Sequence, residues 1–346
     1  MTEPFRVGLT RDLRPEPGHA GWGDTGTSVL DEAPGITWDF LPEKTRNLTA
    51  DLLAGLDGVA MLGGRITAET LAPLDRLTII ARYGVGYDTI DVEACTRAGV
   101  ALTITPDGIR RPMSTAILTF LLALSGRLLQ KDHLTRTGGW ARKIDYMGTG
   151  LTGRTLGLIG VGNIGRDVCK LVAPHDMRII AFDPYATTAP DGVDLVDLDT
   201  LLAESDFVSI CCALTPETHH LIDAHRLGQM KTTAYLINTA RGPIVDQAAL
   251  TVALQQNRIA GAGLDVFDPE PIDPEDPLLA LDNVILTPHA LGWTDHWITN
   301  TGRSALGGII DLSQGRVPTY LVNRDVLDNP HFQAKLAEFA ARSADR

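Results

Sequence analysis

Residues 155–183 read TLGLIGVGNIGRDVCKLVAPHDMRIIAFD, and this stretch decides the fold of the chain. Its first six residues are an apolar run typical of a buried strand, NIGRDVCKLV has the pattern of a helix, and MRIIAFD is a second strand. Between the first strand and the helix, Gly160, Gly162 and Gly165 have the spacing GxGxxG. In this context the glycines predict a tight turn, a close backbone approach to a pyrophosphate and close packing of helix and strand. We therefore expect a βαβ unit that binds a dinucleotide at the N-terminus of its helix.

The end of the second strand indicates which dinucleotide binds. Asp183 lies 18 residues after Gly165, where a carboxylate can bind both ribose hydroxyls of NAD and would repel the extra phosphate of NADP. No arginine closely follows Asp183 to accept that phosphate. NAD is therefore the predicted cofactor, and Asn163 and Ile164, at the start of the helix, are predicted to contact it as well.

The alternation of strand and helix patterns continues on both sides of this unit. Apolar runs at 6–9, 36–41, 58–62, 77–83 and 100–105 alternate with helical segments at 48–56 and 91–99, and further runs follow at 206–214, 234–240, 261–266 and 284–289. Strands that alternate with helices predict parallel sheets. A chain of 346 residues suits two domains. The predicted fold class is α/β, with two Rossmann-like or flavodoxin-like domains.

Three other segments carry structural expectations. Pro112 can occupy the first position of a long apolar helix that crosses between the domains. Residues 298–313 are amphipathic, and a charged tail follows them. Residues 14–28 form a long loop rich in Gly and Pro, which we interpret as a surface excursion, with a lid as the alternative.

Composition excludes several classes of partner. The net charge of -13, with no basic patch, predicts no binding to nucleic acid or to an anionic membrane surface. The four cysteines have neither CxxC spacing nor a Cys/His cluster, so neither a metal site nor a disulfide framework is expected. The first residues lack the pattern of a signal peptide, and the most apolar stretch, 116–129, is too short to span a bilayer. These features predict a cytoplasmic protein.

Five further motifs accompany the glycine-rich turn: ARYGVGYDTID, ALTPETHHLI, NTARGPIVD, GLDVFDPEP and TPHALGW. In this order, between Leu77 and Gly292, they resemble the D-isomer-specific 2-hydroxyacid dehydrogenase family, which includes phosphoglycerate, glycerate, formate and phosphite dehydrogenases and NAD-binding corepressors. The resemblance implies a substrate-binding domain of residues 1–106 plus 294–346 and an inserted NAD-binding Rossmann domain of residues 107–293. It also implies an active site in the cleft and a homodimer built through the nucleotide domain.

Hydride transfer to a 2-oxo acid needs a cation for the carboxylate and a group that moves the hydroxyl proton. Arg241 lies three residues after the predicted strand 234–238, at the edge where parallel sheets bind ligands, and its planar fork can hold a carboxylate. His289 matches the family's acid/base histidine, and Glu270 matches the carboxylate that orients the imidazole and favours its charged form. The predicted catalytic set is thus Arg241, Glu270 and His289.

The resemblance implies further binding residues. Asp265 matches the residue that holds the nicotinamide carboxamide, and the other cofactor contacts are expected at Thr215, Thr239, Ala240 and Gly292. The loop of Tyr83, Gly84, Val85 and Gly86 is expected to bind the substrate, because backbone N–H groups at its glycines can face a carboxylate. Ordinary turn chemistry is the alternative for each of these positions. Trp293 could close the pocket or pack between the domains.

Two departures from the family pattern bear on specificity. Cys211 replaces a histidine near the cofactor and fills space, with redox sensing as the alternative. Arg110 and Arg111 are unexpected cations: either they are a solvated face, or one of them, with Arg65 or Arg82, binds a second anionic group on the substrate. The predicted function is NAD-linked hydride transfer with a small 2-hydroxy or 2-oxo acid. NAD-linked oxidation of a simple anion such as formate or phosphite, and a corepressor-like NAD sensor, are the alternatives.

Overall fold

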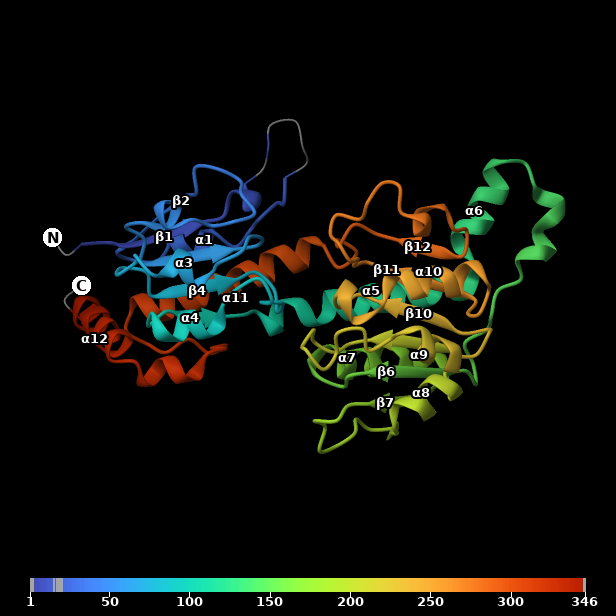
Figure 1. The fold of residues 1–346 in the computed structure, drawn as a ribbon. Coiled ribbons are helices and arrows are strands. Elements are labelled where there is room, and N and C mark those ends of the chain that lie inside the picture. The colour runs from blue at the N-terminus through green and yellow to red at the C-terminus, as the bar shows by residue number, and fades with distance from the viewer. Residues whose placement is uncertain (1–2, 15, 17–20, 345–346) are drawn as a thin grey trace. The chain divides into compact units, whose positions relative to one another are not determined.

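The computed structural model describes residues 3–14, 16 and 21–344. The chain divides into two compact units (Figure 1), one of residues 1–109 and 293–346 and the other of residues 110–292. We call them unit 1 and unit 2. Each contains one parallel sheet, which confirms the predicted α/β class. Part of the loop 14–28, at 15 and 17–20, lies outside the described residues, so its two interpretations stay open.

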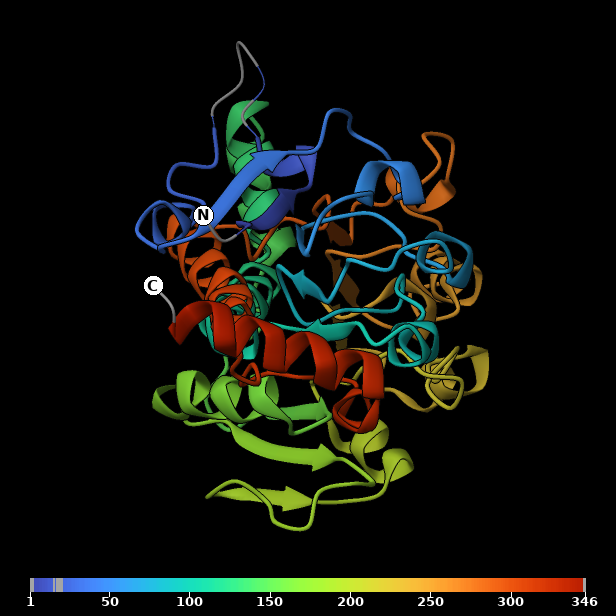
Figure 2. The same ribbon diagram turned by 90° about the vertical axis from the view of Figure 1, so that its left-hand side faces the viewer.

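Unit 1 has a five-stranded sheet in the order β2-β1-β3-β4-β5, which is the flavodoxin-like order. Helices α11 and α12, which lie side by side (Figure 2), cover one face with α1, and α2, α3 and α4 cover the other. Its strands are β1 (Phe5–Leu9), β2 (Ile36–Phe40), β3 (Gly58–Met61), β4 (Ile79–Arg82) and β5 (Ala101–Thr103). Its helices are α1 (Ser28–Asp31), α2 (Ala50–Leu53), α3 (Ala68–Leu71), α4 (Val92–Arg97), α11 (Asp295–Ser313) and α12 (Pro330–Ala344). Short 3-10 helices are η1 (Arg11–Leu13) and η6 (Arg324–Asp328).

Unit 2 has a seven-stranded sheet in the order β12-β11-β10-β9-β6-β7-β8. The strand order reverses between β6 and β9, as in the Rossmann fold, and ligands of such sheets bind beyond the carboxyl ends of the strands at this reversal. Its strands are β6 (Thr155–Ile159), β7 (Arg178–Phe182), β8 (Val193–Leu195), β9 (Phe207–Ile210), β10 (Tyr235–Asn238), β11 (Gly261–Leu264) and β12 (Val284–Leu286). Its helices are α6 (Leu128–Arg136), α7 (Asn163–Val172), α8 (Leu198–Glu204), α9 (Ala224–Gln229) and α10 (Gln247–Gln255), with 3-10 helices η2 (Trp140–Tyr146), η3 (Ala173–His175), η4 (Gly242–Ile244) and η5 (Pro277–Ala280).

Helix α5 (Pro106–Gly126) begins in unit 1 and continues into unit 2. The sequence prediction that Pro112 opens this helix is wrong, because Pro106 takes that position and Pro112 lies inside the helix. The interior proline costs one backbone hydrogen bond, which the buried apolar side of the helix outweighs. Among the described residues no single helix is long and apolar enough to cross a membrane, although α5 and α6 together, bent by 56°, meet that test by length and composition.

Two other expectations differ from the structure. The predicted charged tail forms the helix α12, which buries Phe332 and Phe339 in the core of unit 1. The many charged residues of this segment made its apolar face difficult to recognise in the sequence. The segment 48–56 forms only the four-residue helix α2, because Gly55 adopts a φ of +77° just after it. Strand β8 is short and was not predicted.

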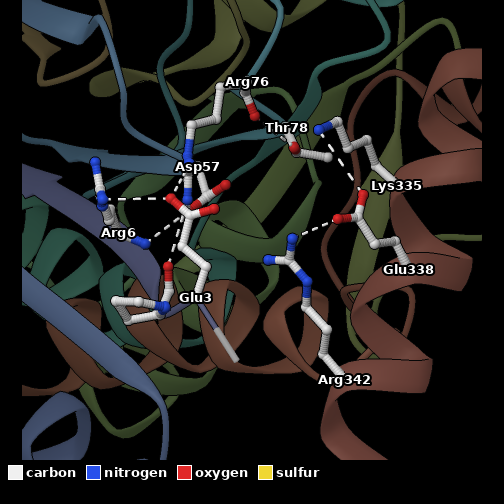
Figure 3. A network of polar contacts seen from close by, with 9 residues as sticks. Glu3, Arg6, Asp57, Arg76, Thr78, Lys335, Glu338 and Arg342 are labelled. Carbon is white, nitrogen blue, oxygen red and sulfur yellow. Dashed lines mark hydrogen bonds and ion pairs between the residues drawn. The ribbon is translucent and has the colours of Figure 1, made fainter. Parts of the chain in front are cut away.

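A polar network ties the N-terminal strand of unit 1 to the rest of its sheet (Figure 3). The Arg76 guanidinium donates to Asp57 Oδ2 at 2.8 Å and to Glu3 at 2.6 Å, and Asp57 also accepts the Arg6 backbone N–H at 2.7 Å. The Asp57 side chain is only 3% exposed. The hydrogen bond with Asp57 raises the pKa of Arg76 above the ordinary value, and the hydrogen bond from Arg76 lowers the pKa of Glu3. The ion pair is therefore nearly removed from water at Asp57.

Replacing Arg76 by alanine is expected to lower the free energy of unfolding by about 2–4 kcal/mol, because it leaves the buried Asp57 carboxylate without its counter-charge. Urea unfolding followed by circular dichroism measures this. Arg342→Ala is the matched control, since the ion pair of Arg342 with Glu338 is more exposed and its loss should cost less than about 1 kcal/mol. Equal stability of the two variants would contradict the assignment.

Candidate active site

The glycine-rich turn joins β6 to α7 at the reversal of strand order in unit 2. Gly160 has a φ of +101° and lies against the Cys211 backbone at the end of β9, so any side chain there would clash. Gly165 packs against the Gly160 carbonyl, which brings α7 close to the strand. A Cβ on Gly162 would meet no atom within 4 Å. The turn is thus tightly packed at Gly160 and Gly165 and leaves free space at Gly162. Gly162 lies at the N-terminus of the ten-residue helix α7, where a bound pyrophosphate needs such space.

Asp183 lies one residue beyond β7 and faces this turn. Its Oδ2 accepts the Val161 N–H at 3.0 Å, and its Oδ1 accepts the Tyr185 N–H at 3.0 Å. The carboxylate therefore stands beside the glycine-rich turn, where sequence reasoning expected it. Asn163 and Ile164 form the first turn of α7.

His289 and Glu270 form a direct pair in unit 2. His289 Nδ1 lies 2.8 Å from Glu270 Oε2, and Glu270 Oε1 accepts the Phe267 N–H at 3.0 Å. Burial alone would raise the pKa of Glu270, but the contacts with His289 and Phe267 and the charge of Arg241 hold it below the ordinary value. The carboxylate is therefore ionised at neutral pH and accepts the Nδ1 proton, which leaves Nε2 as the working nitrogen of the ring. His289 is 44% exposed and can reach a ligand.

Arg241 lies at the carboxyl end of β10, before η4. A buried residue that the sequence analysis missed, Asn238, shapes this turn: its side-chain amide donates to the Arg241 carbonyl at 2.9 Å and its Oδ1 accepts the Ala240 N–H at 3.0 Å. The Arg241 Nη1 donates to the Ala240 carbonyl at 2.8 Å. The charge of Arg241 also helps to lower the pKa of Glu270, the hydrogen-bond partner of His289.

Two more missed residues connect the Arg241 and Glu270 loops. A Cβ on Gly242 would collide with the Phe267 carbonyl, so only glycine allows this contact. Gln247, at the start of α10, accepts the Asp268 N–H at 3.0 Å and donates to Asp276 at 2.8 Å. A signal was present in NTARGP, because Asn after a strand often forms side-chain bonds to a turn. No sequence signal marked Gln247.

Asp265 organises the loop that carries His289. Its buried Oδ1 accepts the Thr287 hydroxyl at 2.6 Å and the backbone N–H groups of Ala290 at 2.9 Å and Leu291 at 3.1 Å. His289 between them has a φ of +54°, a region that non-glycine residues seldom adopt. Asp265 therefore holds a strained histidine in place. The resemblance implied a nicotinamide contact at Asp265, and the observed contacts add a positioning role.

Two residues of the predicted substrate loop, Tyr83 and Gly84, have hydrogen-bond partners within unit 1. Tyr83 is a buried core residue whose hydroxyl donates to the Thr25 carbonyl at 3.0 Å, and burial raises its pKa well above the ordinary value. The Gly84 N–H donates to Thr105 Oγ1 at 2.8 Å. The Gly84 amide therefore has an acceptor within unit 1, and its contact with a substrate stays a prediction. Tyr83 follows Ile79 and Ala81 at every second position, and all three side chains pack in the same core on one face of the sheet.

The remaining amides of this loop are positioned differently. Arg82 donates through Nε to the Gly86 carbonyl at 3.0 Å and through Nη1 to the Tyr83 carbonyl at 2.7 Å, which fixes the turn. Across the described part of the chain, the N–H groups of Val85 and Gly86 have no hydrogen-bond acceptor. The Arg65 side chain is exposed.

Both unexpected arginines of α5 face a carboxylate of α7. Arg111 Nη2 lies 2.9 Å and Arg110 Nε 3.9 Å from Asp167 Oδ1, and the Asp167 side chain is only 4% exposed. The pair holds α5 against the dinucleotide helix. Asp167 therefore supplies a partner for Arg110 and Arg111 within unit 2.

The other predicted cofactor residues lie in turns of unit 2. The Thr215 N–H donates to Thr218 Oγ1 at 2.7 Å, Thr239 is buried beside Ala240, and a side chain on Gly292 would meet the Met113 sulfur. Burial raises the pKa of Cys211 to about 12, so this thiol stays protonated and the redox alternative loses support. All four cysteines are free, and a cytoplasmic location stays a prediction.

Comparisons with known proteins bear on the family and the fold of the chain. Residues 118–290 match the family model described as D-isomer specific 2-hydroxyacid dehydrogenase, NAD binding domain. The glyoxylate reductase of Korarchaeum cryptofilum is 40% identical over 275 residues, 78% of this chain and 83% of the relative. That of Aeropyrum pernix is 37% identical over 331 residues, 93% and 97% of the two chains. The crystal structure of the TT0316 protein from Thermus thermophilus matches with a TM-score of 0.81 and 34% identity, over 92% of this chain and 99% of that one.

Proposed function

The chain belongs to the D-isomer-specific 2-hydroxyacid dehydrogenase family and is an NAD-dependent oxidoreductase, and from this premise we propose that it reduces small 2-oxo acids to 2-hydroxy acids. The observation that carries the proposal is the 2.8 Å contact of His289 with Glu270. A histidine whose Nδ1 is held by an ionised carboxylate presents Nε2 to a ligand as a proton donor and acceptor. Arg241 lies on a neighbouring loop of the same unit.

The three side chains divide the chemistry. Arg241 pairs through its fork with the substrate carboxylate and polarises the adjacent carbonyl. His289 gives a proton from Nε2 to the carbonyl oxygen during reduction and takes it back during oxidation. Glu270 stabilises the imidazolium and fixes the ring. NADH, when bound, supplies the hydride.

NAD is the cofactor of the family, and the residues of unit 2 fit it. Gly162 leaves the space that the pyrophosphate needs, and the amides at the start of α7 point their positive end there. The Asp183 carboxylate would accept the ribose hydroxyls and repel the phosphate of NADP. In the proposal Asp265, Thr215, Thr239, Ala240 and Gly292 contribute the remaining contacts.

The proposed substrate carries one carboxylate. Asp167 forms ion pairs with Arg110 and Arg111, and Arg82 donates to backbone carbonyls. These contacts argue against the hypothesis that the three arginines bind a second anionic group on the substrate. In the proposal unit 1 binds the substrate, and the N–H groups of Val85 and Gly86 are offered to the carboxylate. The relatives named glyoxylate reductase make glyoxylate the first substrate to test.

The test is NADH oxidation at 340 nm with glyoxylate, pyruvate and hydroxypyruvate, and in the reverse direction NAD reduction with formate and phosphite. Turnover of at least one 2-oxo acid, with NADH preferred over NADPH, is expected. Activity with formate or phosphite alone would favour the simple-anion alternative. NADH binding by calorimetry with no turnover of any acid would favour the sensor alternative.

We also propose a homodimer, because one segment of unit 2 exposes large apolar side chains. They lie in the last part of α5 and in the segment that joins α5 to the strand β6, and they are Leu122, Leu128, Leu129, Trp140, Ile144 and Met147, each 44–69% exposed. A monomer seldom exposes such a concentration, whereas a twofold interface buries the same patch on both copies. Light scattering is expected to give twice the 37.2 kDa chain mass. A mass of one chain at micromolar concentration would contradict the proposal.

A further inference from the structure

Unit 1 contains a cluster of three tryptophans that the proposed chemistry does not use. Trp293 and Trp297 stack with ring centroids 5.5 Å apart, and Trp22 meets Trp293 edge to face at 4.6 Å and Trp297 at 5.9 Å. Trp297 is 3% exposed and belongs to the core of the unit, whereas Trp293 is 45% exposed. The cluster thus has a fixed base and one open aromatic surface.

The cluster lies at the ligand-binding edge of the unit 1 sheet. In a sheet of this strand order the binding crevice opens between β1 and β3, beyond their carboxyl ends. There the Leu62 N–H, just after β3, donates to Thr10 Oγ1, just after β1, at 3.1 Å. Trp22 is tied to the same place, because its indole N–H donates to the Asp12 carbonyl at 2.8 Å.

The loop of Trp22 is also tied to the predicted substrate loop. Tyr83, just after β4, donates to the Thr25 carbonyl at 3.0 Å, and Gly302 of α11 packs against the same carbonyl. The aromatic cluster therefore has a rigid position relative to the Val85 and Gly86 amides. Rigid aromatic side chains offer apolar contact with little loss of entropy on binding.

Chain connectivity places Trp293 near the proposed proton donor. Trp293 follows His289 by four residues, and four extended residues span at most about 14 Å. This limit holds for any arrangement of the two units. The backbone of Trp293 therefore stays within about 14 Å of the backbone of His289.

We propose that Trp293, supported by Trp22 and Trp297, binds the substituent at C3 of the substrate and selects 2-oxo acids with an aromatic or bulky apolar group. The inference rests on the proposed function and names the substrate class within it. An exposed indole loses unfavourable contact with water when an apolar group covers it, and aromatic pairs gain further from edge-to-face or stacked geometry. Glyoxylate has no such group and makes no use of this surface.

The test compares kcat/KM for phenylpyruvate and glyoxylate in the wild type and in Trp293→Ala. The variant is expected to lose about tenfold in kcat/KM for phenylpyruvate, equivalent to about 1.4 kcal/mol, and to keep kcat/KM for glyoxylate within about twofold. Trp293→Phe should keep most of the phenylpyruvate activity. Thermal unfolding of both variants checks that the core around Trp297 is intact.

Trp38→Ala is the matched control. Trp38 also packs edge to face, against Phe40 at 5.6 Å, and donates to Asp31 at 2.9 Å, but it lies on the edge strand β2. The Trp38→Ala substitution should leave the ratio of kcat/KM for phenylpyruvate to kcat/KM for glyoxylate unchanged. An unchanged ratio in Trp293→Ala, a gain with phenylpyruvate, or a wild type that reduces glyoxylate but not phenylpyruvate would overturn the inference. Failure to reduce any 2-oxo acid would instead remove the proposed function.

Discussion

Replacing His289 by asparagine is expected to lower kcat for glyoxylate reduction about a thousandfold, equivalent to about 4 kcal/mol of barrier, because positioned proton transfer contributes at this scale. Asparagine is the better choice than alanine, since His289 has a φ of +54° and asparagine tolerates that conformation. The asparagine side chain cannot give or take a proton near neutral pH. Steady-state kinetics and NADH titration measure kcat and cofactor binding separately, and only kcat should change.

His220→Asn is the matched control for this variant. His220 has nearly the same φ, +50°, is exposed, and stacks on His219 with ring centroids 4.1 Å apart. Its substitution should leave kcat within about twofold. An undiminished rate in His289→Asn would remove the proton-shuttle assignment, and an equal loss in both variants would point to a general effect of the left-handed backbone.

Replacing Arg241 by lysine is expected to lower kcat/KM about a hundredfold, or about 2.7 kcal/mol, although the charge is kept. Lysine is a point donor and cannot hold the carboxylate through two parallel hydrogen bonds while polarising the carbonyl. Initial rates across a range of glyoxylate concentrations, at saturating NADH, give this ratio. The dissociation constant of NADH should stay within about threefold.

Arg226→Lys controls for the loss of a guanidinium in unit 2. The Arg226 Nη1 donates to a nearby backbone carbonyl, that of Leu221, at 2.7 Å, much as Arg241 does at 2.8 Å to Ala240. Only Arg241→Lys should reduce kcat/KM. If both variants keep full activity with glyoxylate, the carboxylate is bound elsewhere, and the proposed role of Arg241 is lost.

The sequence predicted those features of the fold that depend on local pattern. The GxGxxG turn, the strand of Asp183 and the strand ends that carry Arg241 and His289 follow from apolar runs and glycine spacing. The start of α5 was misplaced, because both Pro106 and Pro112 can open a helix and only the structure shows which one does. The burial of Tyr83 was not predicted for a different reason: its partner, the Thr25 carbonyl, is 58 positions away and leaves no mark in the local pattern.

The supporting contacts of the site escaped prediction for the same physical reason. Gly242 and Gln247 contact residues of another loop, and these contacts exist only once β10 and β11 lie side by side. Asn238 acts within its own turn, on Ala240 and Arg241. Asp265 was expected at the cofactor, yet its observed partners are a hydroxyl and two amides of the His289 loop. A sequence motif shows which side chain is present at a position. The residues that this side chain contacts depend on the neighbouring strands and loops of the folded chain.

The division of the chain into two units bears on how such a protein can change during evolution. His289, Glu270 and Arg241 all belong to residues 110–292, whereas the tryptophan cluster belongs to the flanking segments. The hydrogen bonds of Glu270 with His289 and Phe267 lie entirely within residues 110–292. Under the two proposals, substrate choice and proton transfer are therefore encoded in different segments of the gene, and a substitution in one segment can change one property while the other is kept.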